Sequence, residues 1–258
     1  MPRFAEMMNK KAAELGLENT HFVTPHGLDM PEHYTTAYEL ALLSSYALDN
    51  KTFAEIVKTS TYTVHMNGYP KEIRNTNELL GHLNGVTGVK TGFTNGANRC
   101  IVTSVERDDM NIITVVLGAD TKKDRTADSV KLIEYTYKNY KNIPIREMVS
   151  SEFENWKKIN QNRIQINKGT KPYIDMELAN LKKEYITIKN TEEKDVSIHI
   201  NYTHYFEAPV KKGQIIGKLA VNIDEREILI LDIVAKEEIK KKTVWNYLIE
   251  LLGISIFR

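Results

Sequence analysis

One tripeptide, Lys90-Thr91-Gly92, constrains the fold of this chain more than any other stretch, although three residues alone recur by chance. Its context carries the argument. Two β-rich runs follow it, residues 100–105 and 112–117, and the polar turn Arg107-Asp108-Asp109 separates them. Glycines lie close to the tripeptide on both sides: Gly85, Gly88 and Gly96. The sequence therefore predicts a Lys-Thr-Gly strand at a sheet edge, followed by a hairpin.

Helical patterns surround this predicted sheet. Apolar residues recur at helical spacing, and Thr36 and Thr52 each stand three residues before a Glu, which is the spacing of a capping box. Asn67-Gly68 is a strong signal for a tight hairpin. The patterns predict helices over residues 3–15, 36–48, 52–58 and 124–140, and a hairpin formed by residues 61–66 and 69–74. This order indicates a sheet with helices packed on it.

The pattern changes near residue 145, and no long helical pattern appears until about residue 239. Short β-runs alternate with polar breaks such as Lys168-Gly169 and Lys212-Gly213. Such spacing is typical of a small β-sandwich. The runs cover residues 163–166, 185–188, 196–200, 214–221 and 227–234. The sequence therefore predicts a first domain over residues 1–143, an all-β domain over 144–238 and a separate segment over 239–258.

The last segment has the properties of an amphipathic helix. Lysines precede the apolar run from Val244 to Phe257, which is too short and too polar to span a bilayer. A basic flank, aromatic residues at the start and a broad apolar face suit a helix that lies in the membrane interface. The alternative is a helix docked on its own domain or in a dimer. The candidate membrane contacts are Trp245, Tyr247, Leu248, Leu251 and Leu252.

Charge and cysteine content exclude several classes of protein. The 35 basic and 34 acidic residues nearly balance, so no global field attracts nucleic acid, and none is expected as a partner. The single cysteine, Cys100, excludes an internal disulfide; its apolar β-run predicts a small buried side chain, with a reactive thiol as the alternative. No stretch is long enough for a membrane span, and Met1-Pro2-Arg3-Phe4 does not open a signal peptide. Taken alone, the sequence predicts a cytosolic chain.

Five blocks along the chain carry a resemblance to a known family. They are residues 4–9 with 15–22, Pro25-His26-Gly27-Leu28-Asp29 with Thr35-Thr36-Ala37, residues 84–94, Leu117-Gly118-Ala119 with Arg125, and residues 208–217. By these blocks the chain resembles the D-alanyl-D-alanine carboxypeptidases among the low-molecular-mass penicillin-binding proteins. The resemblance implies an α+β fold: the C-terminal part of a penicillin-binding, β-lactamase-like transpeptidase domain, then a small all-β sandwich and a C-terminal amphipathic helix.

The resemblance also implies an activity and a set of site residues. Enzymes of this family remove the terminal D-alanine from peptidoglycan stem pentapeptides by acylation of a serine and hydrolysis, and they bind β-lactams. Lys90 would lie by the nucleophile as a catalytic residue, and by the substrate carboxylate. Thr91 would offer that carboxylate a hydroxyl, and Gly92 would let the substrate backbone lie along the strand edge. Arg125 would be a second, bidentate carboxylate anchor. The alternatives are a solvated strand-edge lysine and a solvated arginine beside Asp124 and Asp128.

The sequence departs from the family pattern at the nucleophile. The family carries Ser-x-x-Lys and Ser-x-Asn, and no serine of this chain has Lys three positions on or Asn two positions on. Tyr137-Lys138-Asn139 copies one such spacing but follows the Lys-Thr-Gly strand, so it is set aside. The chain is therefore expected to begin downstream of both motifs, as an internal start or a fragment. We expect it to be inactive alone, and its sheet to expose apolar surface.

Other interpretations stay open at this stage. His26, His33 and His65 fit no metal-ligand spacing, so structural roles are favoured, and neither a metal nor a cofactor is expected.

By family, the site of action is the outer face of the cytoplasmic membrane in the cell envelope, with roles in cell-wall synthesis and cell shape. A non-catalytic envelope module that binds membrane or a partner through the β-domain and terminal helix is the alternative function. A truncated reading frame without a stable fold is the third possibility.

Overall fold

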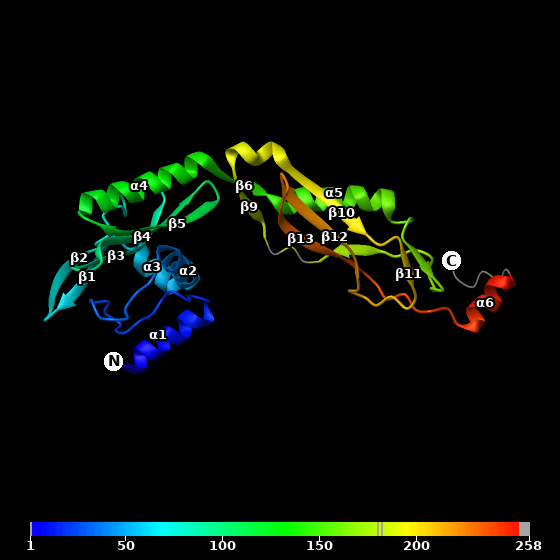
Figure 1. Cartoon of the computed structure of the whole chain (residues 1–258), viewed down its shortest axis with the longest axis horizontal. Helices are drawn as coiled ribbons and strands as arrows, with labels where there is room; N and C mark the ends of the chain where they lie inside the picture. Colours follow the sequence, from blue (N-terminus) through cyan, green and yellow to red (C-terminus); the bar gives the residue numbers. More distant parts are fainter. Residues whose placement is uncertain (1, 180, 182, 253–258) are drawn as a thin grey trace. The chain divides into compact units, whose positions relative to one another are not determined.

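The computed structural model describes residues 2–179, 181 and 183–252. The chain divides into two compact units, Met1–Asn139 and Tyr140–Arg258 (Figure 1). The sequence predicts the boundary four residues later, between residues 143 and 144. The structure assigns residues 140–143 to the second unit because they belong to β6 (Tyr140–Pro144), which pairs with β9 (Tyr185–Lys189) of that unit.

The first unit is built on an antiparallel sheet of three strands in the order β3-β4-β5. Helix α4 lies over one side of this sheet, and α2 and α3 lie on the other (Figure 1). A separate two-stranded hairpin, β1-β2, projects from the unit. The elements are α1 (Pro2–Glu14), α2 (Ala37–Leu48), α3 (Lys51–Lys58), β1 (Thr61–Met66), β2 (Tyr69–Arg74), β3 (Val86–Thr94), β4 (Asn98–Arg107), β5 (Met110–Ala119) and α4 (Lys122–Asn139).

The core of the first unit fills the space between the sheet and α4. Ile101 and Val105 of β4 pack in one cluster with Ile133 of α4, and all three are almost completely buried. Leu79, Leu80 and Val86 complete the cluster. Ser129 Oγ of α4 lies 3.1 Å from Thr103 Oγ1 of the sheet, so these two buried hydroxyls satisfy each other.

Local sequence signals explain where the elements begin and turn. Thr36 caps α2 by accepting a hydrogen bond from Glu39 N at 3.2 Å, as the capping-box spacing predicts. The Glu39 carboxylate instead accepts hydrogen bonds from Asn19 and Thr20, and so ties the preceding loop to α2. Asn50, rather than Thr52, caps α3. Asn67 and Gly68 have φ of 52° and 83°, which is the left-handed backbone that a two-residue hairpin needs.

The prediction that the sheet exposes apolar surface is wrong for most of the sheet. Among the described residues of β3, β4 and β5, only Phe93 and Leu117 are exposed large apolar side chains. The others in this unit lie mainly on α1, α2 and the β1-β2 hairpin. The sheet is better covered than expected because α2 and α3 contact one side of it and α4 the other.

The second unit is built around a four-stranded antiparallel sheet in the order β10-β12-β13-β8. Two small pairs complete it, the parallel pair β7-β11 and the antiparallel pair β6-β9. Its remaining elements are α5 (Ile145–Asn160), β7 (Gln165–Asn167), β8 (Met176–Leu178), η1 (Asn190–Asp195), β10 (Val196–Tyr202), β11 (Tyr205–Glu207), β12 (Ile215–Ile223), β13 (Arg226–Ala235) and α6 (Val244–Leu251). The α+β fold with a C-terminal β domain is thus confirmed.

Two helix predictions in this unit are wrong. The sequence predicts no long helix between residues 145 and 239, yet α5 spans 16 residues. Ile145, Val149 and Phe153 recur every four residues and are buried against the sheet, so the helical spacing was present in the sequence. The predicted helix from residue 239 begins only at Val244, because Ile239 pairs as an extended residue with Val210. Residues 253–258 of that prediction lie outside the described residues.

Candidate functional site

The Lys-Thr-Gly tripeptide lies on β3, as the sequence predicts, and β3 is an edge strand of its sheet. In the register with β4, Lys90 is opposite Val102 and Thr91 is opposite Ile101. Successive side chains of a strand alternate between its faces, so Lys90 points to the side of Val102 and Thr91 to the side of α4. The Lys90 side chain is exposed, and its Nζ donates a hydrogen bond to the Thr91 carbonyl oxygen.

A cleft of about 510 Å³ brings the predicted site residues together. Lys90, Thr91 and Gly92 line it from β3, and Arg125 lines it from α4. Two cations that the sequence analysis did not single out, Arg99 and Lys122, also contribute. The rest of its lining is His26, Gly27, Leu28, Thr76, Phe93, Thr94, Ala97 and Cys100. Four cations and no carboxylate therefore line a cleft beside an open strand edge, which is an arrangement that favours an anionic ligand.

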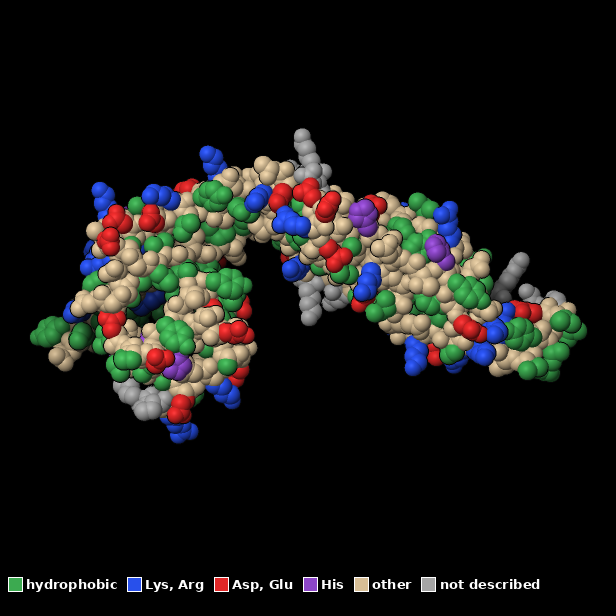
Figure 2. All heavy atoms as spheres, in the orientation of Figure 1, with side chains coloured by type: hydrophobic (Ala, Val, Ile, Leu, Met, Phe, Trp, Pro, Cys, Tyr) green, Lys and Arg blue, Asp and Glu red, His purple; other side chains and the backbone are tan. Residues whose placement is uncertain are grey.

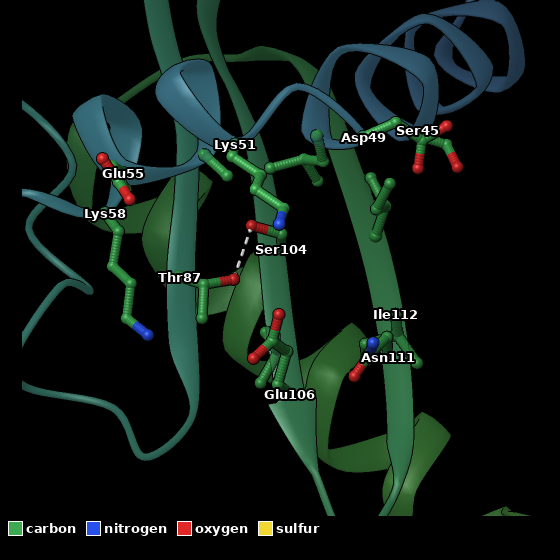
Figure 3. Close-up of a pocket in the computed structure, with 14 residues that line it drawn as sticks. Ser45, Asp49, Lys51, Glu55, Lys58, Thr87, Ser104, Glu106, Asn111 and Ile112 are labelled. Atoms are coloured by element: carbon green, nitrogen blue, oxygen red, sulfur yellow. Dashed lines mark hydrogen bonds between the residues drawn. The ribbon is translucent and has the colours of Figure 1, made fainter.

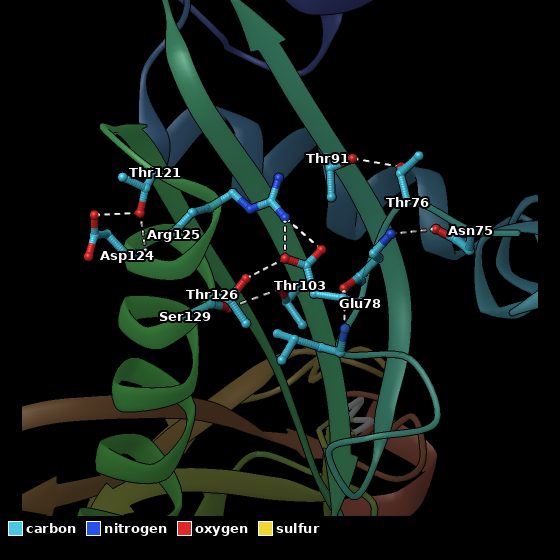
Figure 4. Close-up of polar contacts among 12 residues, drawn as sticks. Asn75, Thr76, Glu78, Thr91, Thr103, Thr121, Asp124, Arg125, Thr126 and Ser129 are labelled. Carbon is cyan, nitrogen blue, oxygen red and sulfur yellow. Dashed lines mark hydrogen bonds and ion pairs between the residues drawn. The ribbon is translucent and has the colours of Figure 1, made fainter.

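Four consecutive residues after the β1-β2 hairpin hold this cleft in place (Figure 4). Asn75 Nδ2 donates to the carbonyl oxygens of Val57 and Thr59, and the Thr76 hydroxyl lies 2.7 Å from that of Thr91. Asn77 is buried, and its Nδ2 donates to the Gly88 carbonyl oxygen at 3.0 Å. Glu78 binds Arg125 and Thr126. This segment, Asn75–Glu78, thereby connects α3, β3 and α4.

Arg125 is a buried cation with an ion pair, so it is not the solvated helix-start residue of the alternative interpretation. Its side chain is only 4% exposed, and Nη2 lies 2.6 Å from both carboxylate oxygens of Glu78. Its Nε is buried without a hydrogen-bond acceptor among the described residues. Burial acts to raise the pKa of Glu78, but hydrogen bonds from Thr126 and Arg125 outweigh it and hold the pKa below its ordinary value. Glu78 is therefore ionised at neutral pH.

Sequence reasoning missed the segment Asn75–Glu78, Arg99 and Lys122 as parts of this site. The polar run Asn75-Thr76-Asn77-Glu78 reads as an approach loop, and nothing in its spacing identifies its partners, which lie up to 48 residues away in the sequence. Arg99 is held by the ring of Phe93, with its guanidinium carbon 3.7 Å from the ring centroid. That contact pairs neighbouring residues of β3 and β4, so only the strand register reveals it.

The loop between α1 and α2 forms another part of the cleft wall. Asp29 Oδ2 accepts a hydrogen bond from Gly96 N at 3.0 Å, which ties this loop to the turn after β3. His26 lines the cleft, and its Nδ1 accepts a hydrogen bond from Leu28 N. His33 Nδ1 accepts one from Val23 N at 3.1 Å, and burial lowers the pKa of His33. Both rings therefore shape the loop, while His65 lies exposed on β1.

A second cavity, of about 500 Å³, lies between the sheet and helices α2 and α3 (Figure 3). Lys51 and Lys58 line it, but so do three carboxylates, Asp49, Glu55 and Glu106. Thr87 and Ser104, which face it, bond each other at 2.9 Å. The mixed charge and the satisfied hydroxyls give this cavity no chemical preference comparable with that of the cleft at Lys90.

Cys100 differs from its prediction, whereas the predicted membrane contacts of the terminal helix are all exposed and remain a prediction. Cys100 is half-buried at the cleft rather than buried, and its Sγ lies 3.4 Å from the Ala97 carbonyl oxygen. On α6, Trp245 is 71% exposed and Leu251 is 87% exposed. Tyr247, Leu248 and Leu252 are exposed as well. No helix among the described residues has both the length and the apolar character that a membrane crossing requires.

Comparison with known proteins matches both units. Residues 1–121 match the D-alanyl-D-alanine carboxypeptidase family, and residues 157–241 match the penicillin-binding protein 5 C-terminal domain. D-alanyl-D-alanine carboxypeptidase DacF of Bacillus subtilis is 31% identical over 97% of this chain and 62% of its own length. DacA of Haemophilus influenzae is 27% identical over 99% of this chain and 62% of its own length. The chain thus spans about 62% of the length of these relatives.

A solved structure supports the same assignment. Penicillin-binding protein 5 from Haemophilus influenzae superposes with a TM-score of 0.71 at 27% identity. That superposition covers 93% of this chain and 67% of the other. It therefore extends across most of the chain, as do the sequence matches to the two relatives. From its fold and these matches, the chain belongs to the D-alanyl-D-alanine carboxypeptidase family.

Proposed function

We propose that the cleft at Lys90 binds the terminal carboxylate of a peptide that ends in D-alanyl-D-alanine. The observation that carries this proposal is the lining of the cleft, which has four cations and no carboxylate beside the edge of β3. Such a site attracts a terminal carboxylate, while the open strand edge offers backbone groups to an extended peptide. The names of the relatives give this ligand its chemical class.

Each predicted residue then has a defined role. Lys90 supplies a point charge on a flexible stem: the residue is exposed, and among the described residues its Nζ donates to the Thr91 carbonyl oxygen. The Thr91 hydroxyl already lies near Thr76, but a hydroxyl can donate one hydrogen bond and accept another. A Cβ on Gly92 would meet nothing closer than 3.9 Å within the protein. Internal packing thus does not require a glycine there, and a ligand backbone that lies against the strand would.

Catalysis in this family needs a serine nucleophile and a base. This sequence contains neither Ser-x-x-Lys nor Ser-x-Asn. We therefore propose that the chain carries the carboxylate-binding half of a serine-type D-Ala-D-Ala carboxypeptidase site. In the whole enzyme, Lys90 would also act beside the nucleophile. Its place of action would be the outer face of the cytoplasmic membrane, in the maturation of cell-wall peptidoglycan.

Isothermal titration calorimetry of the 258-residue chain with the peptide Nα,Nε-diacetyl-L-lysyl-D-alanyl-D-alanine tests the binding proposal. The matched control ligand is the same peptide with a C-terminal amide. We expect the carboxylate to bind and the amide to bind at least about tenfold more weakly, which corresponds to about 1.4 kcal/mol. Lys90→Gln should remove most of that difference. Equal affinities for the two ligands would contradict the proposal.

The catalytic half of the proposal has a separate test. We expect the chain alone to release no D-alanine from the same peptide and to form no covalent adduct with fluorescent penicillin. An adduct that survives denaturing electrophoresis would show a nucleophile in this chain. Lys90→Gln is then the matched variant that tells whether the adduct depends on the cleft.

A second proposal is that α6 binds a membrane surface, and the exposure of its side chains favours it. Val244, Trp245, Leu248 and Leu251 follow the spacing of one helical face, and all are exposed. Lys240 and Lys241 precede the helix, and Figure 2 shows basic side chains beside its green surface. An apolar face next to a basic flank is the pattern of an interfacial helix. As a non-catalytic envelope module, the chain would use this same surface.

Vesicle sedimentation tests the membrane proposal. The chain should sediment with vesicles of phosphatidylglycerol and phosphatidylcholine, and less with phosphatidylcholine alone. Trp245→Glu with Leu251→Glu should abolish sedimentation. The control is Ile159→Glu, which changes another exposed apolar residue on a different helix of the same unit. If the double variant and the native chain sediment alike, α6 does not bind the membrane.

A further inference from the structure

The pairing of Arg125 with Glu78 is one-sided (Figure 4). Both carboxylate oxygens lie 2.6 Å from the same nitrogen, Nη2, instead of forming two parallel hydrogen bonds to two nitrogens. The Nε atom has no acceptor among the described residues, and the other terminal nitrogen points away from Glu78. Much of the hydrogen-bonding capacity of this buried guanidinium therefore remains unused.

Glu78 is held in position independently of Arg125. Its Oε1 also accepts a hydrogen bond from Thr126 Oγ1 at 2.6 Å. Its backbone follows Asn77 and Thr76, which bond to Gly88 and Thr91 of β3. Glu78 is 42% exposed, whereas Arg125 is 4% exposed. The carboxylate thus reaches the buried cation from the solvent side, on a segment already fixed to the site strand.

The charge of Arg125 explains why such a partner is present. A buried cation without a counterion is strongly destabilising. The cleft lining itself contains no carboxylate, so Glu78 supplies the counterion from just outside that lining. A ligand carboxylate that reached Arg125 would then approach a second anion on the same guanidinium. The ligand carboxylate and the Glu78 carboxylate repel each other when both contact one guanidinium, and this repulsion opposes binding.

We propose that Glu78 is a specificity-determining residue of this cleft, an internal counter-anion that competes with a ligand carboxylate for Arg125 and lowers its affinity. This inference rests on the proposed function, because it concerns the same carboxylate site. A ligand must either use the free side of the guanidinium or displace Glu78. Binding at Arg125 is therefore weaker than four cations alone would give, and release of the bound acid is faster.

The first experiment measures the affinity of the 258-residue chain for acetate. Sodium acetate replaces sodium chloride at constant ionic strength, and the Gly92 backbone amide signal in NMR spectra reports binding. Glu78→Gln keeps the size of the side chain and an oxygen for Thr126 but removes the charge. We expect Glu78→Gln to bind acetate about five- to tenfold more tightly than the native chain. Adding Arg125→Gln should abolish this gain.

A matched control separates the local effect from net charge. Glu72→Gln removes an exposed carboxylate on β2 that pairs with Arg74, and so changes the total charge equally. It should leave acetate affinity unchanged. If Glu78→Gln binds acetate no more tightly than Glu72→Gln, the inference is overturned. If Glu78→Gln does not fold, the pKa of Glu78 in the native chain replaces it, measured by NMR with and without acetate. Acetate at Arg125 should raise that pKa, and an unchanged value overturns the inference.

The diacetyl-lysyl-D-alanyl-D-alanine peptide distinguishes this inference from the proposed function. If the peptide binds and Glu78→Gln does not tighten it, the function stands and the role of Glu78 fails. If neither chain binds the peptide but Glu78→Gln gains acetate affinity, the counter-anion role stands and the peptide is the wrong ligand. If Glu78→Gln binds both acetate and the peptide more tightly than the native chain does, both the proposed function and the counter-anion role of Glu78 are supported.

Discussion

The hydroxyl of Thr76 lies 2.7 Å from the hydroxyl of Thr91, and this contact ties the segment Asn75–Glu78 to the Lys-Thr-Gly strand. Thr91 is buried on the strand, whereas Thr76 is exposed. The contact therefore sets the position of the one hydroxyl in the tripeptide. The two threonines are therefore not equivalent. Exposed Thr76 can bond to water when Thr91 is replaced, whereas buried Thr91 cannot do so when Thr76 is replaced.

Replacement of Thr76 with Val should leave the buried Thr91 hydroxyl without its partner. We expect a loss of about 1–3 kcal/mol in the free energy of unfolding, since an unsatisfied buried hydroxyl loses its solvation. Thr91→Val is the matched variant, and it should cost less because exposed Thr76 can bond to water. Urea unfolding followed by circular dichroism measures both. A larger loss for Thr91→Val would contradict the assignment.

Of the segment Asn75–Glu78, Asn77 is the residue whose replacement should lower the free energy of unfolding most. Its Nδ2 donates to the Gly88 carbonyl oxygen at 3.0 Å, and its Oδ1 accepts from Leu79 N at 3.1 Å. Asn77→Asp keeps the shape but removes the donor and adds a buried charge, so we expect a loss of about 2 kcal/mol or more at neutral pH. Asn95→Asp, on an exposed turn, should change stability by less than about 0.5 kcal/mol. The same urea titration distinguishes them.

Gly85 should tolerate no side chain. Its φ is +77°, and a Cβ there would lie 2.4 Å from the Glu106 carbonyl oxygen. Gly81 has a similar φ of +75° but open space around it. We expect Gly81→Ala to cost about 1 kcal/mol for the left-handed backbone. Gly85→Ala should cost about 1–3 kcal/mol more for the clash, as measured by thermal unfolding. Equal costs would show that the approach of β4 is not this close.

Helix α5 should be essential to the second unit. Phe153 is buried in its core, and its ring centroid lies 6.0 Å from that of Trp156. Phe153→Ala should lower the free energy of unfolding by about 3–5 kcal/mol. Ile159→Ala, on the exposed side of the same helix, should change it by less than about 0.5 kcal/mol. Both tryptophans lie in this unit, so their fluorescence reports its unfolding specifically.

The stability of the second unit should fall in acid partly through Asp175. The pKa of Asp175 is lowered mainly by the hydrogen bond from Lys157, whose Nζ lies 2.6 Å away. A carboxylate whose pKa is lowered by folding stabilises the folded state at pH values above its unfolded-state pKa, near 3.8. That stabilisation is lost as the pH falls through the folded-state pKa. Asp175→Asn should therefore be less stable than the native chain at pH 7, and the difference should vanish near pH 2. Glu177→Gln, at an exposed site on the adjacent β8, is the control for the change in net charge.

Several elements of both units follow from local sequence alone. Asn67-Gly68 determines the β1-β2 hairpin because Asn and Gly adopt left-handed backbone at low cost. Thr36 determines the start of α2 because its hydroxyl bonds to a free backbone N–H. In the second unit, strands β9, β10, β12 and β13 follow from β-branched runs between polar breaks, whereas the sequence analysis did not predict β6, β8 and β11. Helix α5 was missed although its spacing was readable, since charged and polar residues dilute its apolar face.

The features of the candidate site also separate into those that the sequence predicts and those that only the folded chain reveals. The Lys-Thr-Gly tripeptide and the lack of a Ser-x-x-Lys motif can be read directly from the sequence, and the family resemblance predicts Lys90, Thr91, Gly92 and Arg125 as site residues. The burial of Arg125 and its pairing with Glu78 follow only from the packing of the folded chain. Motifs and caps depend on neighbours a few residues away, whereas the ion pair of the buried Arg125 joins segments 47 residues apart, which meet only when the sheet and α4 pack together.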